Sequence, residues 1–255
     1  MKGLKNPSAR FSGRVEDYER GRPGYPDPLY DVLLAWAAAA TTLRVVDLGA
    51  GTGLACAPLV RRGVRVVAVE PNDEMRAACE RRFAGTPGLE VRAGSAEATG
   101  LADRSADLAL AAQAFHWFDP VATRAELSRI LVPPHRVALV WNARRDATTP
   151  FLREYEQLLL AFGTDYEQVG HRGVGRERLE AFYGGPVRTE RFDNRQWLDR
   201  DGLRARLLSS SYVPAAGEPR HLEMLAALDA LFDRYHDGGR VAIDYDTELH
   251  LGTLT

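Results

Sequence analysis

The stretch Val45-Val46-Asp47-Leu48-Gly49-Ala50-Gly51-Thr52-Gly53 decides the fold of this chain. Residues 43–48 form a short apolar, β-branched run, which predicts a buried parallel strand. Three glycines at alternate positions follow, and residues 54–60 then suit a helix. A strand, a glycine loop and a helix in this order point backbone N–H groups and a helix N-terminus at a ligand. Glycine leaves the space that the ligand needs, because a Cβ atom would fill it.

The spacing of the glycines discriminates between the ligands that such a loop can bind. A dinucleotide-binding loop reads G-x-G-x-x-G, but the position of its third glycine is taken by Leu54. A phosphate-binding P-loop requires a lysine, and no lysine follows Lys5. The pattern that remains is D-x-G-x-G-x-G. A glycine-rich turn without special function is the plain alternative.

The D-x-G-x-G-x-G pattern resembles the first motif of class I S-adenosylmethionine-dependent methyltransferases. Their cofactor carries no pyrophosphate, so an acidic residue beside the loop is compatible with binding. The resemblance implies that Asp47 faces the ammonium group of the methionine moiety. It also implies S-adenosylmethionine as cofactor, S-adenosylhomocysteine as product, and cofactor contacts from Gly49, Ala50, Gly51 and Gly53.

Length and composition limit the class of protein. A chain of 255 residues suits one domain, and a net charge of −2 gives no global field that would recruit nucleic acid or an anionic membrane. The two cysteines, Cys56 and Cys79, cannot build a disulfide framework, which favours a reducing, cytoplasmic setting. Residues 1–14 lack the apolar core of a signal peptide, and no run reaches the roughly 18 apolar residues of a membrane-spanning helix.

The N-terminal arm, residues 1–26, is polar and arginine-rich except for three aromatic residues. A disordered tail does not need Phe11, Tyr18 and Tyr25, so we expect the arm to fold over another part of the protein. In enzymes that this chain resembles, such an arm orders over the filled site. We therefore interpret the arm as a lid, with Tyr18 and Arg22 facing the cofactor. The alternative is an arm that packs permanently for stability.

Three polar residues mark predicted helix starts. Asp27 is expected to be an N-cap with Pro28 at the first helical position, and this helix runs to about Ala40. Asn72 is expected to cap a second helix. Asp119, followed by proline, begins a third in the same way.

An acidic residue ends the second predicted strand, residues 64–69. Glu70 lies about 20 residues past the first glycine, where Rossmann-like folds bind ribose hydroxyls. Pro71 ends the strand directly after it and fixes its position. The alternative reading is a solvated charge at a strand end, and we favour the ribose role.

The third predicted strand, residues 89–92, leads into Gly94-Ser95-Ala96-Glu97. This loop resembles the family's loop around adenine, where a backbone N–H and a carboxylate contact the edge of the ring. The resemblance implies that role for Ala96 and Glu97. A helix N-terminus capped by Ser95 is an alternative, and both descriptions can hold together.

The run Gln113-Ala114-Phe115-His116-Trp117-Phe118 follows the fourth predicted strand, residues 106–112. It lies at the carboxyl end of that strand, where open α/β sheets place their ligand crevice. The first two residues are assigned to the cofactor. His116 and Trp117 are predicted to form the active centre, with Phe118 behind them facing the substrate.

The role of His116 depends on the acceptor. A hydroxyl acceptor must lose a proton, and a histidine of near-neutral pKa is the natural base. A carboxylate acceptor needs no base, and His116 would then orient the substrate. The alternative is that the aromatic rings are core and that His116 merely precedes the next helix.

These units predict an α/β protein. Successive strand–helix units give a Rossmann-like three-layer αβα sandwich with a mostly parallel sheet. Late strands near 187–197 and 241–251 suit the closing pair of the methyltransferase sheet, which has seven strands in the order 3-2-1-4-5-7-6 with strand 7 antiparallel. We expect one domain, residues 1–255, made of an arm and helix (1–40), a cofactor-binding core (41–142), a helical cap (143–185) and closing strands and helices (186–255).

Several further stretches together resemble the trans-aconitate methyltransferase-like group of small-molecule enzymes. The similarity spans almost the whole chain, apart from Pro133-Pro134-His135, where the group usually has Pro-Gly-Gly. The stretches are Phe11-Ser12-Gly13-Arg14, Arg22-Pro23-Gly24-Tyr25-Pro26, Gln113 to Asp119, Leu139-Val140-Trp141-Asn142, Ser210-Ser211-Tyr212-Val213-Pro214 and Tyr245-Asp246-Thr247.

This resemblance implies a small organic acceptor, methylated on a carboxylate or hydroxyl oxygen. Arg144 and Arg145 could hold an anion bidentately, and Trp141, Asn142 and Phe118 are further candidates for contact with the substrate. Nitrogen and carbon acceptors remain open. No metal is expected, and the protein is expected to be a monomer or homodimer.

Other classes of protein fit the sequence less well. A nicotinamide oxidoreductase would share the fold and the acidic strand end, but the glycine spacing disagrees with it. A binding or regulatory protein that had lost catalysis would not need the intact loop, Glu70 and the aromatic run. Methylation of nucleic-acid bases is disfavoured, because those enzymes carry an Asp/Asn-Pro-Pro-aromatic run that Gln113-Ala114-Phe115-His116 does not resemble.

Overall fold

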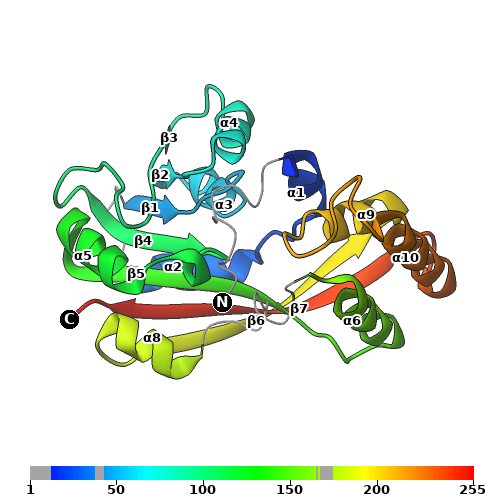
Figure 1. The fold of residues 1–255 in the computed structure, drawn as a ribbon. Coiled ribbons are helices and arrows are strands. Elements are labelled where there is room, and N and C mark those ends of the chain that lie inside the picture. The colour runs from blue at the N-terminus through cyan, green and yellow to red at the C-terminus, as the bar shows by residue number, and fades with distance from the viewer. Residues whose placement is uncertain (1–12, 38–42, 165, 167–174) are drawn as a thin grey trace.

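A seven-stranded sheet forms the centre of the computed structural model, which describes residues 13–37, 43–164, 166 and 175–255 (Figure 1). The strand order is β3-β2-β1-β4-β5-β7-β6, as predicted. The strands are β1 (Arg44–Leu48), β2 (Arg65–Val69), β3 (Leu89–Arg92), β4 (Ala106–Ala112), β5 (Leu131–Arg144), β6 (Arg188–Leu198) and β7 (Val241–Thr253).

The pairing of the strands confirms the predicted directions. The five strands from β3 to β5 run parallel to their neighbours. β7 runs antiparallel to both β5 and β6. The carboxyl ends of β1, β2 and β4 therefore lie together on one edge of the sheet, which is where a ligand crevice is expected.

Helices cover both faces of the sheet, because its central strands are apolar on both sides. Val45 and Val46 are neighbours in β1, point to opposite faces and belong to separate hydrophobic clusters. The Val45 cluster includes side chains from α2 (Asp27–Trp36) and α3 (Cys56–Arg61). The Val46 cluster includes side chains from α5 (Pro120–Ile130) and α8 (Arg176–Tyr183).

The long strands β6 and β7 extend beyond the parallel part of the sheet (Figure 1). Around this extension lie α6 (Pro150–Phe162), α9 (Arg200–Leu208) and α10 (His221–Tyr235), which share a third hydrophobic cluster with the strands. This late part of the chain thus forms a second wall beside the carboxyl ends of the parallel strands.

The predicted helix starts hold in two of three cases. The Asn72 side chain accepts a hydrogen bond from the Met75 N–H at the start of α4 (Asp73–Arg82), and Asp119 caps α5 in the same way. The prediction for Asp27 was wrong: Pro26 is the N-cap of α2. Asp27 is instead the first residue of the helix, and its carboxylate accepts a hydrogen bond from Arg62 at 2.9 Å. α2 ends at Trp36, and residues 38–40 of the predicted helix lie outside the described residues.

The alternative reading of residues 94–97, a helix N-terminus capped by Ser95, is not found in this fully described stretch. Ser95 and Ala98 pair in an isolated bridge, with Ser95 N–H donating to the Ala98 carbonyl at 3.1 Å. The side chain of Ser95 is therefore not a helix cap. The chain passes from β3 to β4 as a loop, which leaves residues 95–97 at the edge of the crevice.

The arm residues that the structure describes form α1 (Val15–Gly21), which packs against α9. Gly21 makes this approach possible, because a Cβ atom there would lie 2.4 Å from the backbone of Ala205 and Arg206. The Arg14 guanidinium donates to the carbonyls of Leu208 and Ser210 at the end of α9. The third aromatic residue of the arm, Phe11, lies outside the described residues.

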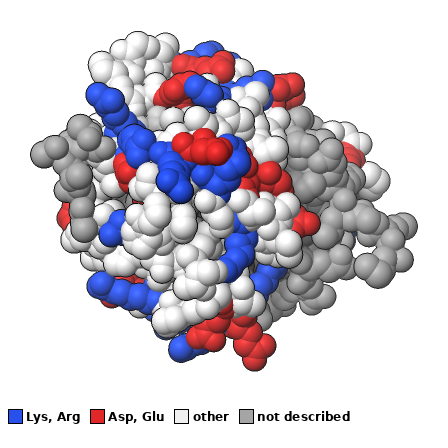
Figure 2. Space-filling model, turned by 90° about the vertical axis from the view of Figure 1, so that its left-hand side faces the viewer, with Lys and Arg blue, Asp and Glu red and all other residues white. Residues whose placement is uncertain are grey.

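The surface carries no field of one sign on the face shown in Figure 2. This view looks at the end of the molecule where the parallel strands begin, and basic and acidic side chains are intermixed there. Ion pairs such as Arg44–Asp107 and Arg129–Asp103 have lengths of 2.8 and 2.7 Å. Within the described ranges, none of the helices is long and apolar enough to cross a membrane.

Replacement of Gly21 by alanine should loosen the arm from α9. Overpacking costs about 1–3 kcal/mol, so the amide protons of residues 15–21 should exchange on the order of tenfold faster. Hydrogen exchange monitored by mass spectrometry measures this directly. Gly24→Ala is the matched control, because a Cβ atom at Gly24 would meet nothing within 4 Å. Equal exchange in both variants would contradict the tight contact.

Candidate active site

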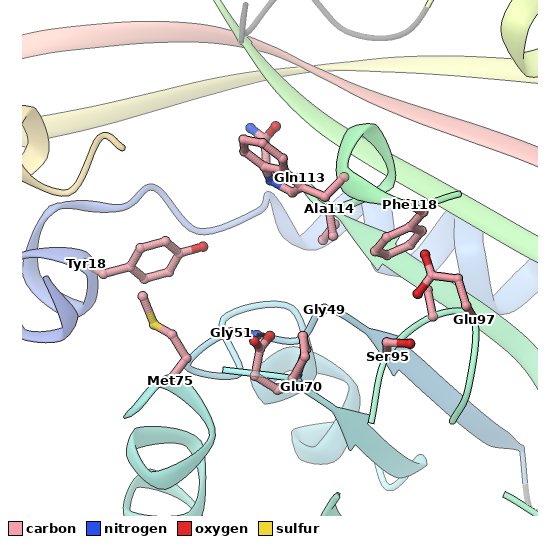
Figure 3. Close-up of a pocket in the computed structure, with 14 residues that line it drawn as sticks. Tyr18, Gly49, Gly51, Glu70, Met75, Ser95, Glu97, Gln113, Ala114 and Phe118 are labelled. Carbon is pink, nitrogen blue, oxygen red and sulfur yellow. Dashed lines mark hydrogen bonds between the residues drawn. The ribbon is translucent and has the colours of Figure 1, made fainter. Parts of the chain in front are cut away.

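A cavity of about 290 Å³ lies at the carboxyl ends of β1, β2 and β4. Figure 3 shows that the labelled residues around it come from α1, the glycine loop, the end of β2, α4 and the loops after β3 and β4. Its walls are formed by Tyr18, Gly49, Gly51, Glu70, Pro71, Met75, Ser95, Ala96, Glu97, Ala112, Gln113, Ala114, Trp117 and Phe118.

The glycines of the loop after β1 have two different functions. Gly51, with φ of +58°, faces the cavity, and the atoms nearest to a Cβ there would belong to Tyr18, the first at 3.6 Å. Gly53 faces away from the cavity, since a Cβ atom there would lie 2.5 Å from Phe83 and 2.9 Å from Cys79 of α4. Gly49 lines the cavity as predicted. Ala50 and Gly53 do not, so the structure gives Gly53 a packing function.

Glu70 lines the cavity and holds the loop in place at the same time. One carboxylate oxygen accepts from the Gly51 N–H at 2.9 Å, and the other accepts from the Asn72 N–H at 2.8 Å. Burial raises the pKa of this carboxyl group, although both hydrogen bonds act to lower it. Each oxygen keeps a further lone pair, so Glu70 can still accept hydrogen bonds from ligand hydroxyls.

Asp47 lies beneath the glycine loop, with 1% of its surface exposed. Its Oδ2 accepts a hydrogen bond from the Cys56 thiol at 3.1 Å, and its Oδ1 has no donor among the described residues. Burial raises the pKa of Asp47 to about 7. Asp47 is not a wall residue of the cavity, in contrast to the glycines above it. The Oδ1 atom can therefore accept a hydrogen bond from a donor of a bound molecule.

The far end of the cavity is formed by the loop after β3. Ser95 and Glu97 lie on the opposite side from Tyr18 and Met75 (Figure 3). Glu97 accepts a hydrogen bond from the Asp119 N–H at 2.9 Å, which links this loop to the start of α5. The predicted residues Ala96 and Glu97 are thus brought together with Glu70 in one cavity.

Gln113 has a strained backbone conformation. Its φ of +57° is in the left-handed region, which is uncommon for a residue other than glycine. The amide side chain donates to the Asn142 carbonyl at 3.2 Å. Strain of this kind concentrates where a structure holds a side chain for function.

The aromatic run after β4 divides between core and cavity. Phe115 is 1% exposed and packs on Trp141 and Phe182, so it belongs to the core. Trp117 and Phe118 line the cavity, but His116 is not among its wall residues. The three residues Phe115–Trp117 form a 3₁₀ turn, which directs successive side chains about 120° apart.

The predicted substrate residues are only partly brought to the site. Trp141 is buried against Phe115 and His250 and belongs to the core. Arg144 is paired with Glu156 and donates to the Tyr166 hydroxyl at 2.7 Å. Arg145 is paired with Asp193 and Asp246. Because carboxylates of this chain engage both guanidinium groups, the arrangement does not support their predicted role in anion binding.

A second, small cavity of about 20 Å³ adjoins the first and shares Tyr18 and Gln113 with it. Asn142, a predicted substrate residue, lies on its wall, as does Arg22 from the end of the arm. Sequence reasoning assigned no site role to Arg206, which matches no functional pattern, or to Tyr245, although Tyr245 lies in a stretch that carries the family resemblance. The wall consists of Tyr18, Arg22, Pro23, Tyr25, Leu54, Gln113, Asn142, Arg206 and Tyr245.

A glycine loop and an acidic strand end around one cavity, at the carboxyl edge of a parallel sheet, are typical of Rossmann-like nucleotide-binding proteins. Comparison with known proteins specifies the class further. A family model described as a methyltransferase domain matches residues 46–138. An uncharacterised methyltransferase of Mycobacterium tuberculosis is 40% identical over 253 residues and covers 98% of both chains. An uncharacterised methyltransferase-like protein of Schizosaccharomyces pombe is 30% identical over 93% of this chain and 92% of its own.

Solved structures have the same fold. A protein from Anaeromyxobacter dehalogenans, provisionally assigned as a type II methyltransferase, superposes with a TM-score of 0.63 at 25% identity, over 91% of this chain and 98% of its own. Phosphoethanolamine N-methyltransferase 2 of Haemonchus contortus, solved in complex with S-adenosyl-L-methionine, gives a TM-score of 0.55 at 14% identity, over 94% of this chain and 56% of its own. The chain therefore belongs to the S-adenosylmethionine-dependent methyltransferases.

The affinity for S-adenosylhomocysteine should depend on pH through Asp47. Because its pKa is raised, Asp47 is largely protonated in the folded protein below pH 7. The ligand-free protein therefore loses stability as pH rises from about 4 to about 7, because ionisation of Asp47 costs more in the folded than in the unfolded chain. An ammonium group favours the ionised form, so binding releases a proton below pH 7. The affinity for S-adenosylhomocysteine should thus rise by up to about tenfold for each pH unit until pH 7 and then level off.

Calorimetry between pH 5.5 and 8.5 measures this dependence. Asp47→Asn should abolish it, because the titrating group is removed. 5′-Methylthioadenosine lacks the amino-acid part, and its affinity for the natural protein should stay constant over the same range. A flat profile for S-adenosylhomocysteine with the natural protein would show that Asp47 does not face the ammonium.

Proposed function

We propose that this enzyme transfers the methyl group to an oxygen atom of a small organic molecule, a carboxylate or a hydroxyl. The observation that carries the proposal is the small polar cavity beside the cofactor cavity. Its size of about 20 Å³ and its walls of tyrosine, arginine and amide side chains suit one polar group rather than a macromolecular surface. The resemblance to trans-aconitate methyltransferase-like enzymes supports the same class of acceptor.

The cofactor assignment uses residues that line the larger cavity, together with Asp47 beneath the glycine loop and Arg22 on the wall of the adjoining small cavity. We assign Glu70 to the ribose hydroxyls, and Ala96 with Glu97 to the adenine edge. The orphaned Asp47 Oδ1 suits the ammonium group, and the backbone that Gly51 exposes leaves room for the methionine moiety. We assign the remaining contacts to Tyr18, Arg22, Gly49, Pro71, Gln113 and Ala114.

In methyl transfer the protein mainly positions the reactants and excludes water. S-adenosylmethionine supplies an electrophilic methyl group, whose carbon–sulfur bond breaks as the acceptor oxygen forms the new bond and the electron pair passes to sulfur. Trp117 and Phe118 offer aromatic faces that can stabilise a sulfonium ion. Alignment within the cavity supplies most of the rate, because displacement at carbon needs an in-line approach.

A carboxylate acceptor fits this site better than a hydroxyl. Carboxylate attack needs no general base, whereas a hydroxyl must lose a proton. The described wall residues of both cavities include no histidine, and His116 lies off the wall of each. We therefore propose that Trp117, rather than His116, is the member of the predicted pair that contacts the reacting groups.

The arm is proposed to close the site. Tyr18 reaches over the glycine loop, and Arg22 stacks on its ring at 5.0 Å. The Gly13 N–H donates to Glu74 of α4 at 2.6 Å, so α1 bridges α4 and α9 across the cavity mouth. In this arrangement the arm excludes water from the site, and it must move for the cofactor to exchange.

A screen of about a hundred small metabolites with methyl-labelled cofactor tests the proposed function. We expect labelled methyl esters, or ethers if a hydroxyl accepts, detected by mass spectrometry. Unlabelled reactions and heat-treated enzyme are the controls. Label found only in protein or nucleic acid, or on nitrogen or carbon, would contradict the proposal.

Trp117 should discriminate the charged cofactor from its neutral product. A cation–π contact is worth about 0.5–2 kcal/mol, so Trp117→Leu should weaken S-adenosylmethionine relative to S-adenosylhomocysteine by about 2- to 30-fold. Calorimetric titration of both ligands measures the ratio.

His116→Gln is the matched control at the adjacent position. It should leave the ratio of the affinities for S-adenosylmethionine and S-adenosylhomocysteine unchanged, and turnover should stay within about threefold. A loss of turnover above about a hundredfold, the range of general-base catalysis, would restore His116 as the base. An unchanged ratio in Trp117→Leu would remove Trp117 from the sulfonium.

A further inference from the structure

The inward face of the edge strand β6 carries two amide side chains. Phe192, Asn194 and Gln196 are half-buried, whereas the residues between them face solvent, as the alternation of a strand requires. The inward side of a strand is normally apolar, and asparagine is depleted in strands. Two amides on that side therefore need hydrogen-bond partners that the sheet itself does not provide.

Both amides donate to carbonyl groups of the arm. Gln196 Nε2 donates to the Gly21 carbonyl at 2.9 Å. Asn194 Nδ2 donates to the Gly24 carbonyl, also at 2.9 Å. These two carbonyls lie on either side of Arg22 and Pro23. The arm is therefore held to β6 at two points that enclose Arg22.

The bond to Gly24 is supported by a buried polar ladder across three strands. Asn142 of β5 donates to the same carbonyl at 3.2 Å, and its Oδ1 accepts from Asn194 at 3.1 Å. Thr247 of β7, the cross-strand neighbour of Asn142, donates its hydroxyl to the same Oδ1 at 2.5 Å. These contacts fix the direction of both amides. They also show that the Asn142 side chain is occupied by the arm.

The bond to Gly21 has a similar support. The Tyr245 hydroxyl donates to Gln196 Oε1 at 3.3 Å and accepts from Arg206 Nε at 3.1 Å. Tyr245 and Arg206 are both buried. A chain of hydrogen bonds thus runs from α9 across β7 and β6 to the arm, and the amide of Gln196 is its last member.

Arg22 is the residue whose position these bonds determine. Its backbone is extended, with φ of −78° and ψ of 136°, which Pro23 favours in the residue before it. The guanidinium donates to the Ser209 carbonyl at 2.7 Å, and its buried Nε has no acceptor among the described residues. In the same ranges neither Arg22 nor Arg206 pairs with a carboxylate. Arg22 also lines the small cavity beside the assigned cofactor site.

We propose that Asn194 and Gln196 are positioning residues, which hold the two carbonyls around Arg22 and thereby direct its guanidinium towards the amino-acid part of the cofactor. Neither amide lines either cavity, so each acts through the arm. Holding the arm in advance reduces the conformational entropy that is lost when the cofactor binds. This inference rests on the proposed assignment of Arg22 to the cofactor.

Paired binding measurements test the positioning role. Asn194→Leu and Gln196→Met keep the approximate size of each side chain and remove its amide. Each change should weaken S-adenosylhomocysteine by about 2- to 12-fold, the range for a neutral hydrogen bond. 5′-Methylthioadenosine lacks the amino-acid part, so its affinity should stay within about twofold, as for most surface substitutions. Calorimetry measures both ligands.

Two results of these measurements would overturn the proposal. Equal losses for S-adenosylhomocysteine and 5′-methylthioadenosine would show a general defect of the fold. Unchanged affinity for S-adenosylhomocysteine in both variants would show that the amides do not position the arm for binding.

Arg191→Ala is the matched control on the outward face of β6. Arg191 is exposed and pairs with Glu248, so its replacement should change neither affinity. Hydrogen exchange without ligand gives a direct readout of the arm. Residues 15–22 should exchange faster in Asn194→Leu and Gln196→Met than in Arg191→Ala, while β4 exchanges as in the natural protein. Unchanged protection of the arm in both amide variants would contradict the inference.

A double-mutant cycle shows whether the amides act through Arg22. If they do, Gln196→Met should cost little further affinity for S-adenosylhomocysteine once Arg22→Met has removed the guanidinium. The effects of the two changes should then be non-additive, as expected for coupled residues. Additive losses would mean that Gln196 affects the cofactor by another route, and would overturn its positioning role.

The proposed function and this inference can fail separately. Arg22→Met should weaken S-adenosylhomocysteine by at least about tenfold, the value of a charged hydrogen bond. If it did not, the assignment of Arg22 would fail, and the inference with it. If Arg22→Met weakened the ligand but neither amide variant did, only the positioning role of Asn194 and Gln196 would fail.

Discussion

The two hydrogen bonds that Glu70 accepts hold the site together. They join the end of β2 to the glycine loop at Gly51 and to Asn72, whose side chain caps α4. The loop, the strand end and the helix start are therefore one unit rather than three neighbouring features. Because Gly53 also fits closely against α4, the same helix is held from the loop side and from the strand side. This unit fixes the floor of the cavity, and the arm and the late elements close over it.

Buried charge is distributed unevenly around this floor. The carboxyl group of Asp47 lies beneath the loop, whereas the positive Arg22 and Arg206 lie above it, between the arm and α9. A zwitterionic amino acid placed between the two sides would meet an opposite charge at each end. The protein thus stores electrostatic cost in its ligand-free state, and ligands of matching charge relieve it. Arg144 differs from these two arginines, because Glu156 of the same chain neutralises its charge.

The sequence predicted the fold correctly, and it named many of the residues that the structure places around one cavity. The order of the strands and the positions of Gly49, Gly51, Glu70, Ala96 and Glu97 follow from motifs that are contiguous or separated by one strand–helix unit. Predictions were weaker where a side chain's direction depends on its neighbours. His116 leaves the cavity because the 3₁₀ turn rotates it away, although Trp117 beside it lines the wall. Asp27 is not a cap, because α2 begins at Asp27 itself, and its carboxylate is hydrogen-bonded to Arg62 of a later helix end.

The sequence by itself determined the parallel core and its glycine loop, because the strand pattern, the glycine spacing and the acidic strand end act over short distances along the chain. Only the tertiary structure decided which arginines are balanced. Arg144 and Arg145 follow a strand that leads to the site, yet Glu156, Asp193 and Asp246 neutralise them. Arg206 reaches the site because α1 packs on α9, where Arg22 bonds a carbonyl 187 residues away. Ion pairing depends on which segments fold side by side, and no local pattern contains that information.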